Sequence, residues 1–415
     1  MSALGDLRGS AARPRWVAVS WSPSLMLFLC VFTSQAAVLV LSPILVEVAR
    51  DLHVSTAAAG QLRVFAAPVA VGVAVLVARF GGQLPLRSLL SAGAILVGAG
   101  SIASAAAPSF VGLALAQVPL WIGVAVLVAG GVGAAGSWSA PEARSRVVAR
   151  ALAGAPAAWI AGMPVIGLVA EVNWRLAFLA VPLPAAVATG AIVLSARPGR
   201  SEHRADASLV RLLREPGARG WAFGELLAMS SWAGMLVFSG ALFVETYGAS
   251  PRLTGLLLAL VALAYLGGNT LGGRIHGRCH LRRALARGNV AASAAVALTW
   301  LIRPNLLVTL VLFGCAAVIV GARTVSGTAY GFVLAGERKL EVGAARSALT
   351  HTGYLAGSLL GGAALVLGGY AAVGVLFGLL FLAATAPYVT TWGARCVDRG
   401  RMVTKPEPSL APAAP

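Results

Sequence analysis

Charged residues are scarce in this sequence. Only 11% of its 415 residues are charged, whereas 58% are hydrophobic and the mean hydropathy is +0.84. A soluble globular protein is about one-quarter charged, so the composition excludes an ordinary soluble fold and predicts a protein of the lipid bilayer. Alternation of apolar and polar residues is also missing, which argues against a membrane β-barrel. We therefore expect an all-α integral membrane protein.

Catalytic motifs and cysteine patterns are lacking as well. The sequence contains no nucleophile elbow, phosphate-binding loop or metal-ligand spacing. Its four cysteines lie far apart, without zinc-site spacing or an obvious disulfide pairing: Cys30, Cys279, Cys315 and Cys396. We predict neither an enzyme nor a protein that needs a metal or another cofactor.

Apolar runs of about twenty residues are abundant, as membrane-spanning helices require. We predict twelve spans, at 23–46, 57–78, 88–106, 109–134, 147–170, 177–195, 220–244, 252–273, 284–302, 305–330, 345–368 and 371–392. No convincing cleavage site follows the first run, so we expect a retained span rather than a signal peptide.

The basic residues fix an orientation. Of the 32 Lys and Arg, 26 lie in the segments on one side of the predicted membrane and four in the loops on the other. By the positive-inside rule, we expect both termini to be cytoplasmic. We expect the protein itself to lie in the inner (plasma) membrane. The net charge of +18 therefore resides in short membrane loops and does not indicate a nucleic-acid partner.

The chain divides into two similar halves. Residues 23–195 and 220–392 each hold six predicted spans, with a cytoplasmic central loop at 196–219 and tails at 1–22 and 393–415. At an offset of 195 residues, positions of the first half fall on the same residue type in the second: Gly60, Gly72, Arg79, Arg87 and Gly93 on Gly255, Gly267, Arg274, Arg282 and Gly288. At an offset of 199, Gly154, Ala158 and Gly162 fall on Gly353, Gly357 and Gly361. Two parallel six-helix bundles are the plan of one large transporter class.

The fifth span is unusually rich in small residues. Gly154, Ala158 and Gly162 recur every four residues along one ridge, which lets a neighbouring helix approach to backbone contact. Pro156 and Pro164 each remove an internal hydrogen bond and should bend the helix.

Four stretches within 23–392 resemble the major facilitator superfamily, most closely its twelve-span drug and metabolite efflux branch. TAAAGQLRVFAAPVAVGVAVLVARFGGQLPLRSLL is similar to the family's second span and following loop, and GGRIHGRCHLRRAL repeats that loop motif. PEARSR at 141–146 resembles the sequence that precedes the fifth span. The fifth-span resemblance lies in Gly162, Pro164 and Gly167, followed by Trp174, Arg175 and Phe178. It implies the major facilitator fold and, because the motif is associated with exporters, export by alternating access.

The chain departs from the family pattern at three positions. Gly82 and Gly277 stand where the loop motif normally has an aspartate that helps latch the inward gate. Gln117 stands where relatives have a fourth-span arginine tied to proton coupling. The motif arginines remain as gate and helix-packing candidates, namely Arg79, Arg87, Arg274, Arg278 and Arg282.

Ionisable side chains within spans are costly and therefore informative. We expect Glu225, Arg323 and His351 to form an alternative coupling network, since an imidazole exchanges protons near neutral pH. The alternatives are an interfacial acid for Glu225 and a packing role for His351. For Arg63 and Glu47, an ion pair or gate contact at the outer ends of their spans is favoured over substrate binding.

Amides and aromatic rings at mid-span depth predict an amphipathic, charge-poor cavity. The candidates are Gln35, Gln117, Trp121, Trp159, Trp232, Asn269, Arg323 and Tyr354. Each tryptophan has lipid or helix packing as its alternative. Because deep acids are scarce, we expect an uncharged or weakly cationic substrate.

The preferred hypothesis is a monomeric secondary transporter that exports a small organic molecule in exchange for protons. One alternative is a uniporter or importer of a sugar-like or amphipathic metabolite. The other is a non-transporting membrane scaffold or sensor derived from a transporter.

Overall fold

The structure is a computed structural model that describes residues 22–80, 84–138, 147, 150–195, 212–214, 217–275, 278–335 and 339–389. The regular elements within these ranges are helices. Eleven helical segments of the described chain are long and apolar enough to cross a membrane. The protein is therefore an all-α, multi-pass membrane protein, as its composition predicts.

The first part of the chain forms a bundle of helices, several of which are interrupted. Its elements are α1 (Pro23–Leu39), α2 (Leu41–Asp51), α3 (Thr56–Gly60), α4 (Leu62–Phe80), α5 (Leu86–Ala106), α6 (Phe110–Trp138), α8 (Gly154–Ala157), η2 (Ala158–Gly162), α9 (Met163–Ala170), α10 (Trp174–Ala180) and α11 (Pro182–Leu194). The bend expected from Pro156 and Pro164 coincides with η2, a π-helical turn of the kind that relaxes helices near such breaks.

The second part begins with one long helix and ends with a broken one. Its elements are α13 (Ala218–Tyr247), α14 (Pro251–Gly272), α15 (Arg278–Leu301), α16 (Leu306–Ala335), α17 (Lys339–Ala383) and α18 (Ala386–Val389). The last apolar segment, Ala348–Val389, has 42 residues. A straight helix of that length would measure about 63 Å, twice the hydrocarbon core. It is interrupted at Gly368 and Gly369, where Gly369 has a φ of 62° that favours glycine.

Several spans extend further than the hydropathy pattern predicts. The first continues to Asp51, beyond the predicted end at residue 46, because α2 follows α1 after a break at Val40. The sixth begins at Trp174 instead of 177, since Asn173 caps the first turn by accepting a hydrogen bond from the Arg175 amide at 2.9 Å. Trp174 and Arg175, expected in a loop, thus belong to a helix.

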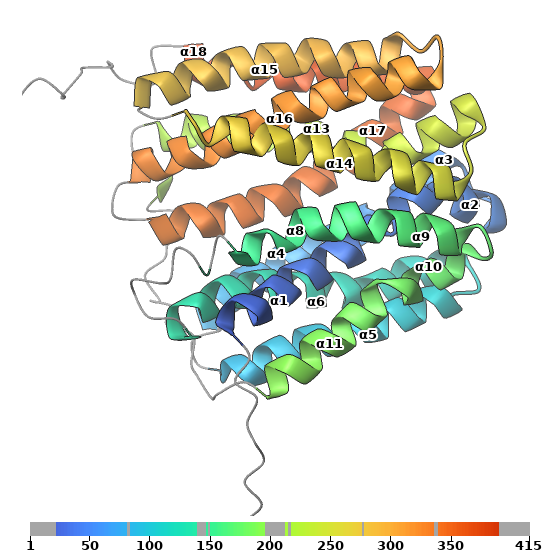
Figure 1. The fold of residues 1–415 in the computed structure, drawn as a ribbon, viewed down its shortest axis with the longest axis vertical. Helices are drawn as coiled ribbons and strands as arrows, with labels where there is room; N and C mark the ends of the chain where they lie inside the picture. Colours follow the sequence, from blue (N-terminus) through green and yellow to red (C-terminus); the bar gives the residue numbers. More distant parts are fainter. Residues whose placement is uncertain are drawn as a thin grey trace, which may run out of the picture.

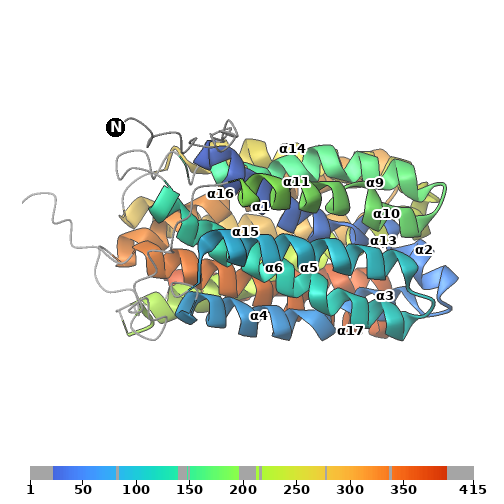
Figure 2. The same cartoon turned by 90° about the horizontal axis from the view of Figure 1, so that it is seen from below.

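The two groups of helices lie side by side. In Figure 1, α13, α14, α15 and α16 occupy the upper part of the view, and α1, α5, α6 and α8–α11 the lower part. Seen from below in Figure 2, α2, α3 and α10 gather at one end of the bundle. We call this end the Asp51 end, after the last residue of α2.

Glycines that the sequence pairs between the halves occupy equivalent places. Gly154 packs against the α1 backbone at Phe28, and its counterpart Gly353 packs against the α13 backbone at Met229. Arg87 donates to the Leu194 carbonyl at the end of α11, at 3.4 Å. In the second half, Arg282 donates to the Tyr388 carbonyl in α18, at 2.7 Å. These arginines therefore tie helix ends together within each half.

Candidate functional site

The halves touch one another at the Asp51 end through polar side chains. Thr56 Oγ1 of α3 donates to Glu245 of α13, and Tyr370 of α17 donates to the same carboxylate at 2.8 Å. Ser250 Oγ, which precedes α14, donates to Glu171 at the end of α9, at 2.6 Å. This end of the interface is closed.

Backbone contacts close the same end more tightly than side chains alone can. A Cβ added at Gly240 of α13 would overlap the Ser42 carbonyl of α2, and one added at Gly255 of α14 would overlap the Met163 carbonyl of α9. A Cβ at Gly167, from the resemblance motif, would overlap the Pro251 carbonyl. The glycine-rich fifth span therefore lies at the boundary between the halves.

A small aromatic cluster crosses between the halves in the middle of the bundle. Trp121 of α6 is 1% exposed and has two edge-on neighbours on α17. The ring of His351 lies 6.2 Å from that of Trp121, and the ring of Tyr354 lies 6.3 Å from it. Trp121 therefore lies next to a second predicted cavity residue, Tyr354, and to one coupling candidate, His351.

Arg63 of α4 is buried beside this cluster and does not form the expected ion pair with Glu47, whereas the expected gate contact stays a prediction. Its side chain donates to the Val38 carbonyl at 2.7 Å and to Ser42 Oγ at 3.4 Å. The guanidinium also lies 5.3 Å from the centre of the Tyr354 ring. Among the described residues no carboxylate pairs with it, and Glu47, its expected partner, has a buried oxygen, Oε2, that lacks a hydrogen bond.

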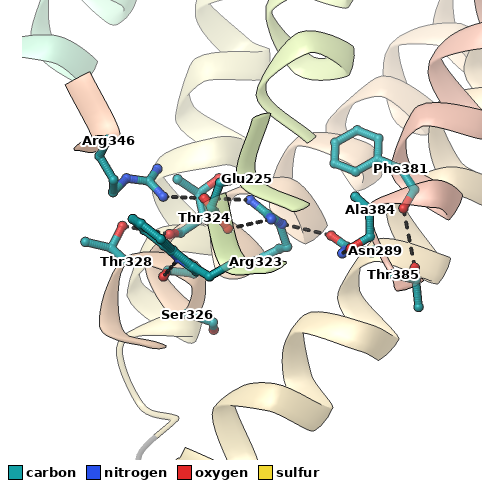
Figure 3. A network of polar contacts seen from close by, with 12 residues as sticks. Glu225, Asn289, Arg323, Thr324, Ser326, Thr328, Arg346, Phe381, Ala384 and Thr385 are labelled. Carbon is teal, nitrogen blue, oxygen red and sulfur yellow. Dashed lines mark hydrogen bonds and ion pairs between the residues drawn. The ribbon is translucent and has the colours of Figure 1, made fainter. Parts of the chain in front are cut away.

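The strongest polar constellation joins α13, α15, α16 and α17 (Figure 3). Arg323 donates to both oxygens of Glu225, at 2.6 Å and 3.1 Å, and both side chains are fully buried. Arg346 pairs with Glu225 Oε2 as well. Arg323 Nε donates to Asn289 Oδ1 at 2.8 Å, and Asn289 in turn donates to the Ala384 carbonyl at 2.9 Å. One carboxylate is thus held by two guanidinium groups.

This constellation brings together Glu225 and Arg323 of the predicted coupling network, whose part in coupling stays a prediction. Glu225 is not an interfacial acid, because it is 0% exposed and faces Arg323. His351 lies five residues beyond Arg346 on α17 and faces Trp121 of the other half. Sequence reasoning missed Arg346 and Asn289. Their only signal was polar character near the start of an apolar run, which does not reveal a partner on another helix.

Asn289→Ala should lower the free energy of unfolding by about 1–3 kcal/mol, because it leaves the Arg323 Nε–H and the Ala384 carbonyl unpaired in a buried place. Thermal or denaturant unfolding of the purified protein in detergent would measure this loss. Thr299→Val is a matched control on the same helix, since Thr299 is buried but bonds only the Ala295 carbonyl of its own helix. Equal losses for the two variants would contradict a bridging role for Asn289.

The remaining cavity candidates fall into separate contacts. Trp159 donates to Gln35 at 3.4 Å, and both side chains are half-buried. Trp232 stacks on Tyr265, with ring centres 5.5 Å apart. Gln117 is buried and donates to Ser104 of α5 at 2.9 Å, so it joins two helices of one half.

Other predicted residues take part in packing or lie outside the description. Asn269 of α14 is half-buried against Gly321 of α16. Ala158 and Gly162 are buried in η2, and Pro164 lies in the first turn of α9. Arg274 follows α14 and is exposed. Several predicted positions lie outside the described residues: Gly82, Gly277, the stretch 141–146, the central loop from 196 to 211, both tails and the side chains of Arg79 and Arg278. Within the described ranges, no three His, Cys, Asp or Glu side chains gather as a metal site would require.

Comparisons with known proteins show which family and which solved structures the chain resembles. A family model described as Major Facilitator Superfamily matches residues 27–244. A bacterial homolog of the human lysosomal transporter Spinster, solved in an inward-facing and unoccupied conformation, has a TM-score of 0.70 at 14% identity, covering 88% of this chain and 94% of that one. A D-xylose-proton symporter gives 0.69 at 15% identity, covering 88% and 96%. The human organic anion transporter MFSD10 gives 0.61 at 18% identity, covering 91% and 100%. No curated protein matches significantly in sequence.

Proposed function

The chain belongs to the major facilitator superfamily of membrane transporters, and we propose that it is a twelve-span secondary transporter that exports a small organic molecule by alternating access. The twelfth span follows from dividing the last apolar segment at Gly368 and Gly369. In this proposal residues 23–195 and 220–392 are the two rocking units, and both termini are cytoplasmic.

The observation that carries the proposal is the contact between the units. At the Asp51 end they meet through backbone at Gly240 and Gly255, whose lack of a side chain permits close but separable packing. The Asp51 end then corresponds to the non-cytoplasmic face, and the structure represents a state closed on that side. Rocking of parallel repeats about a central site is the expected motion of such transporters.

Export is favoured over import by the fifth span. Its Gly- and Pro-rich sequence resembles the exporter motif, and it lies on α14 of the other unit through Gly167 and Gly255. The alternatives, a uniporter or importer and a non-transporting scaffold, share the fold but predict other behaviour. The named structural relatives differ in substrate, so the fold leaves the substrate open.

Proton exchange is assigned to the cluster between the units. Both oxygens of the Glu225 carboxylate are occupied by Arg323 and Arg346. We therefore assign the titrating role to His351, whose ring contacts Trp121 of the opposite unit. The Glu225 group then serves to position α17.

The test is flux in proteoliposomes loaded with the compounds that stabilise the purified protein. We expect uphill movement driven by a pH gradient, with the gradient response lost in His351→Gln while counterflow is retained. Counterflow without any pH response would favour the uniporter or importer. No saturable flux, together with unchanging accessibility of engineered cysteines, would favour the scaffold. A full pH response in both His351→Gln and Glu225→Gln would contradict proton coupling through these residues.

A further inference from the structure

Charge in the buried interior is unbalanced. Three charged side chains of the described chain are almost completely buried: Arg63, Glu225 and Arg323, at 1%, 0% and 2% exposure. Glu225 and Arg323 neutralise each other, with Arg346 adding a further cation from the edge. Arg63 is left as a desolvated cation without a paired carboxylate among the described residues. Such a charge is costly in a bilayer and is usually retained for a function.

Arg63 also lies at the right depth for a substrate site. Its guanidinium binds the carbonyl of Val38, which is near the middle of the 29-residue apolar segment Pro23–Asp51. Tyr354, on which it stacks, is near the middle of the part of α17 that precedes the break at Gly368. The cation therefore lies close to the membrane midplane, at the contact between the two units, where transporters of this plan bind their substrates.

Its hydrogen bonds leave capacity for a ligand. Both hydrogen bonds that Arg63 donates use Nη2, while its Nε–H is buried and has no hydrogen-bond partner. The Tyr354 ring, which belongs to the opposite unit, covers the guanidinium through a cation–π contact. That contact is weaker than a charge-assisted pair with a carboxylate, so an anion can replace it when the units move apart.

We propose that Arg63 is the substrate-recognition residue of this transporter and that its ligand is a small organic carboxylate with an aromatic or other apolar body. The carboxylate binds the planar guanidinium fork, which fits it better than an ammonium would. The apolar body lies against Tyr354 and Trp121, whose rings are in contact. This class differs from the uncharged or weakly cationic substrate expected from the sequence, because the sequence placed Arg63 at the outer end of its span. The inference rests on the proposed transport function.

The test uses matched pairs of probes on the full-length protein in detergent. Thermal unfolding is followed with benzoate and benzamide, 2-naphthoate and 2-naphthamide, and indole-3-acetate and indole-3-acetamide. At least one carboxylate should raise the unfolding temperature in a concentration-dependent way, whereas its amide should not. Arg63→Gln should weaken binding of that carboxylate by about tenfold or more and abolish its advantage over the amide. Arg252→Gln, which removes an exposed arginine, should change neither.

Arg63→Lys separates recognition from support of the α1–α2 break, and it is the variant to use where Arg63→Gln does not fold. It retains the charge and a donor for Val38 but loses the fork, so carboxylates should stay preferred with about tenfold weaker binding. The proposal is overturned if no carboxylate binds, if amides bind equally well, if the preference survives in Arg63→Gln, or if Arg63→Lys binds like the native protein. Arg63-dependent binding without flux in proteoliposomes would support this binding site and refute the proposed transport. Flux of neutral compounds that does not depend on Arg63 would support transport and refute this binding site.

Discussion

Glu225→Ala is expected to destabilise the folded protein by about 3–5 kcal/mol, the usual cost of removing one partner of a buried ion pair. The loss follows from the geometry of the carboxylate, which accepts two hydrogen bonds from Arg323 and pairs with Arg346. Without it, Arg323 remains as an uncompensated cation that is 2% exposed. Denaturant or thermal unfolding in detergent would measure the change.

A double-mutant cycle separates this penalty from simple loss of packing. Glu225→Ala combined with Arg323→Leu removes the charge left behind, so the double variant should be less destabilised than the sum of the two single variants. Asp51→Ala is the exposed control. Asp51 and Arg175 also form an ion pair, but their side chains are 46% and 29% exposed, and such pairs contribute at most about 1 kcal/mol. Additive losses in the cycle would show that the buried pair has no special coupling.

Hydropathy predicted the helices well because membrane spans are selected by composition over some twenty residues. The pairing of glycines between the halves could also be predicted from the sequence, since Gly154 packs closely against α1 and Gly353 packs closely against α13. These features depend on local sequence or on its repetition. They required no knowledge of which side chains meet in space.

The polar contacts were predicted less well for a physical reason. The partner of Glu225 on α17 is Arg346, 121 residues away, and only the packing of α13 against α17 brings them together. Arg63 was assigned to an outer end by counting residues from the start of its span, but its long side chain reaches Val38 in the middle of another. The position of a residue along its own helix therefore does not tell how deep in the membrane the charged end of a long, flexible side chain lies.

Gly255→Ala is expected to lower transport by about tenfold or more while leaving the protein folded. Gly255 of α14 contacts the backbone of α9 across the two units, and a Cβ there would overlap the Met163 carbonyl. Overpacking of this kind costs about 1–3 kcal/mol. In the proposed alternating-access cycle this contact is made only when the Asp51 end is closed, so the cost falls on one of the two states. It shifts their ratio by about 5- to 150-fold, since each 1.4 kcal/mol is a factor of ten.

Gly267→Ala supplies the control for this substitution, because Gly267 lies on the same helix and a Cβ there would meet nothing within 4 Å. It should transport at the native rate. In a background without the native cysteines, Ala249→Cys reports on the Asp51 end, because Ala249 is only 5% exposed when this end is closed. Gly255→Ala should speed its labelling by a membrane-impermeant maleimide, whereas Gly267→Ala should not. If both alanine variants transport equally and label at the same rate, closure of the Asp51 end is not part of the transport cycle. If Gly255→Ala alone loses flux and labels faster, the close approach of α14 to α9 is the closed gate, because a single methyl group on one face of one helix would then distinguish the two states.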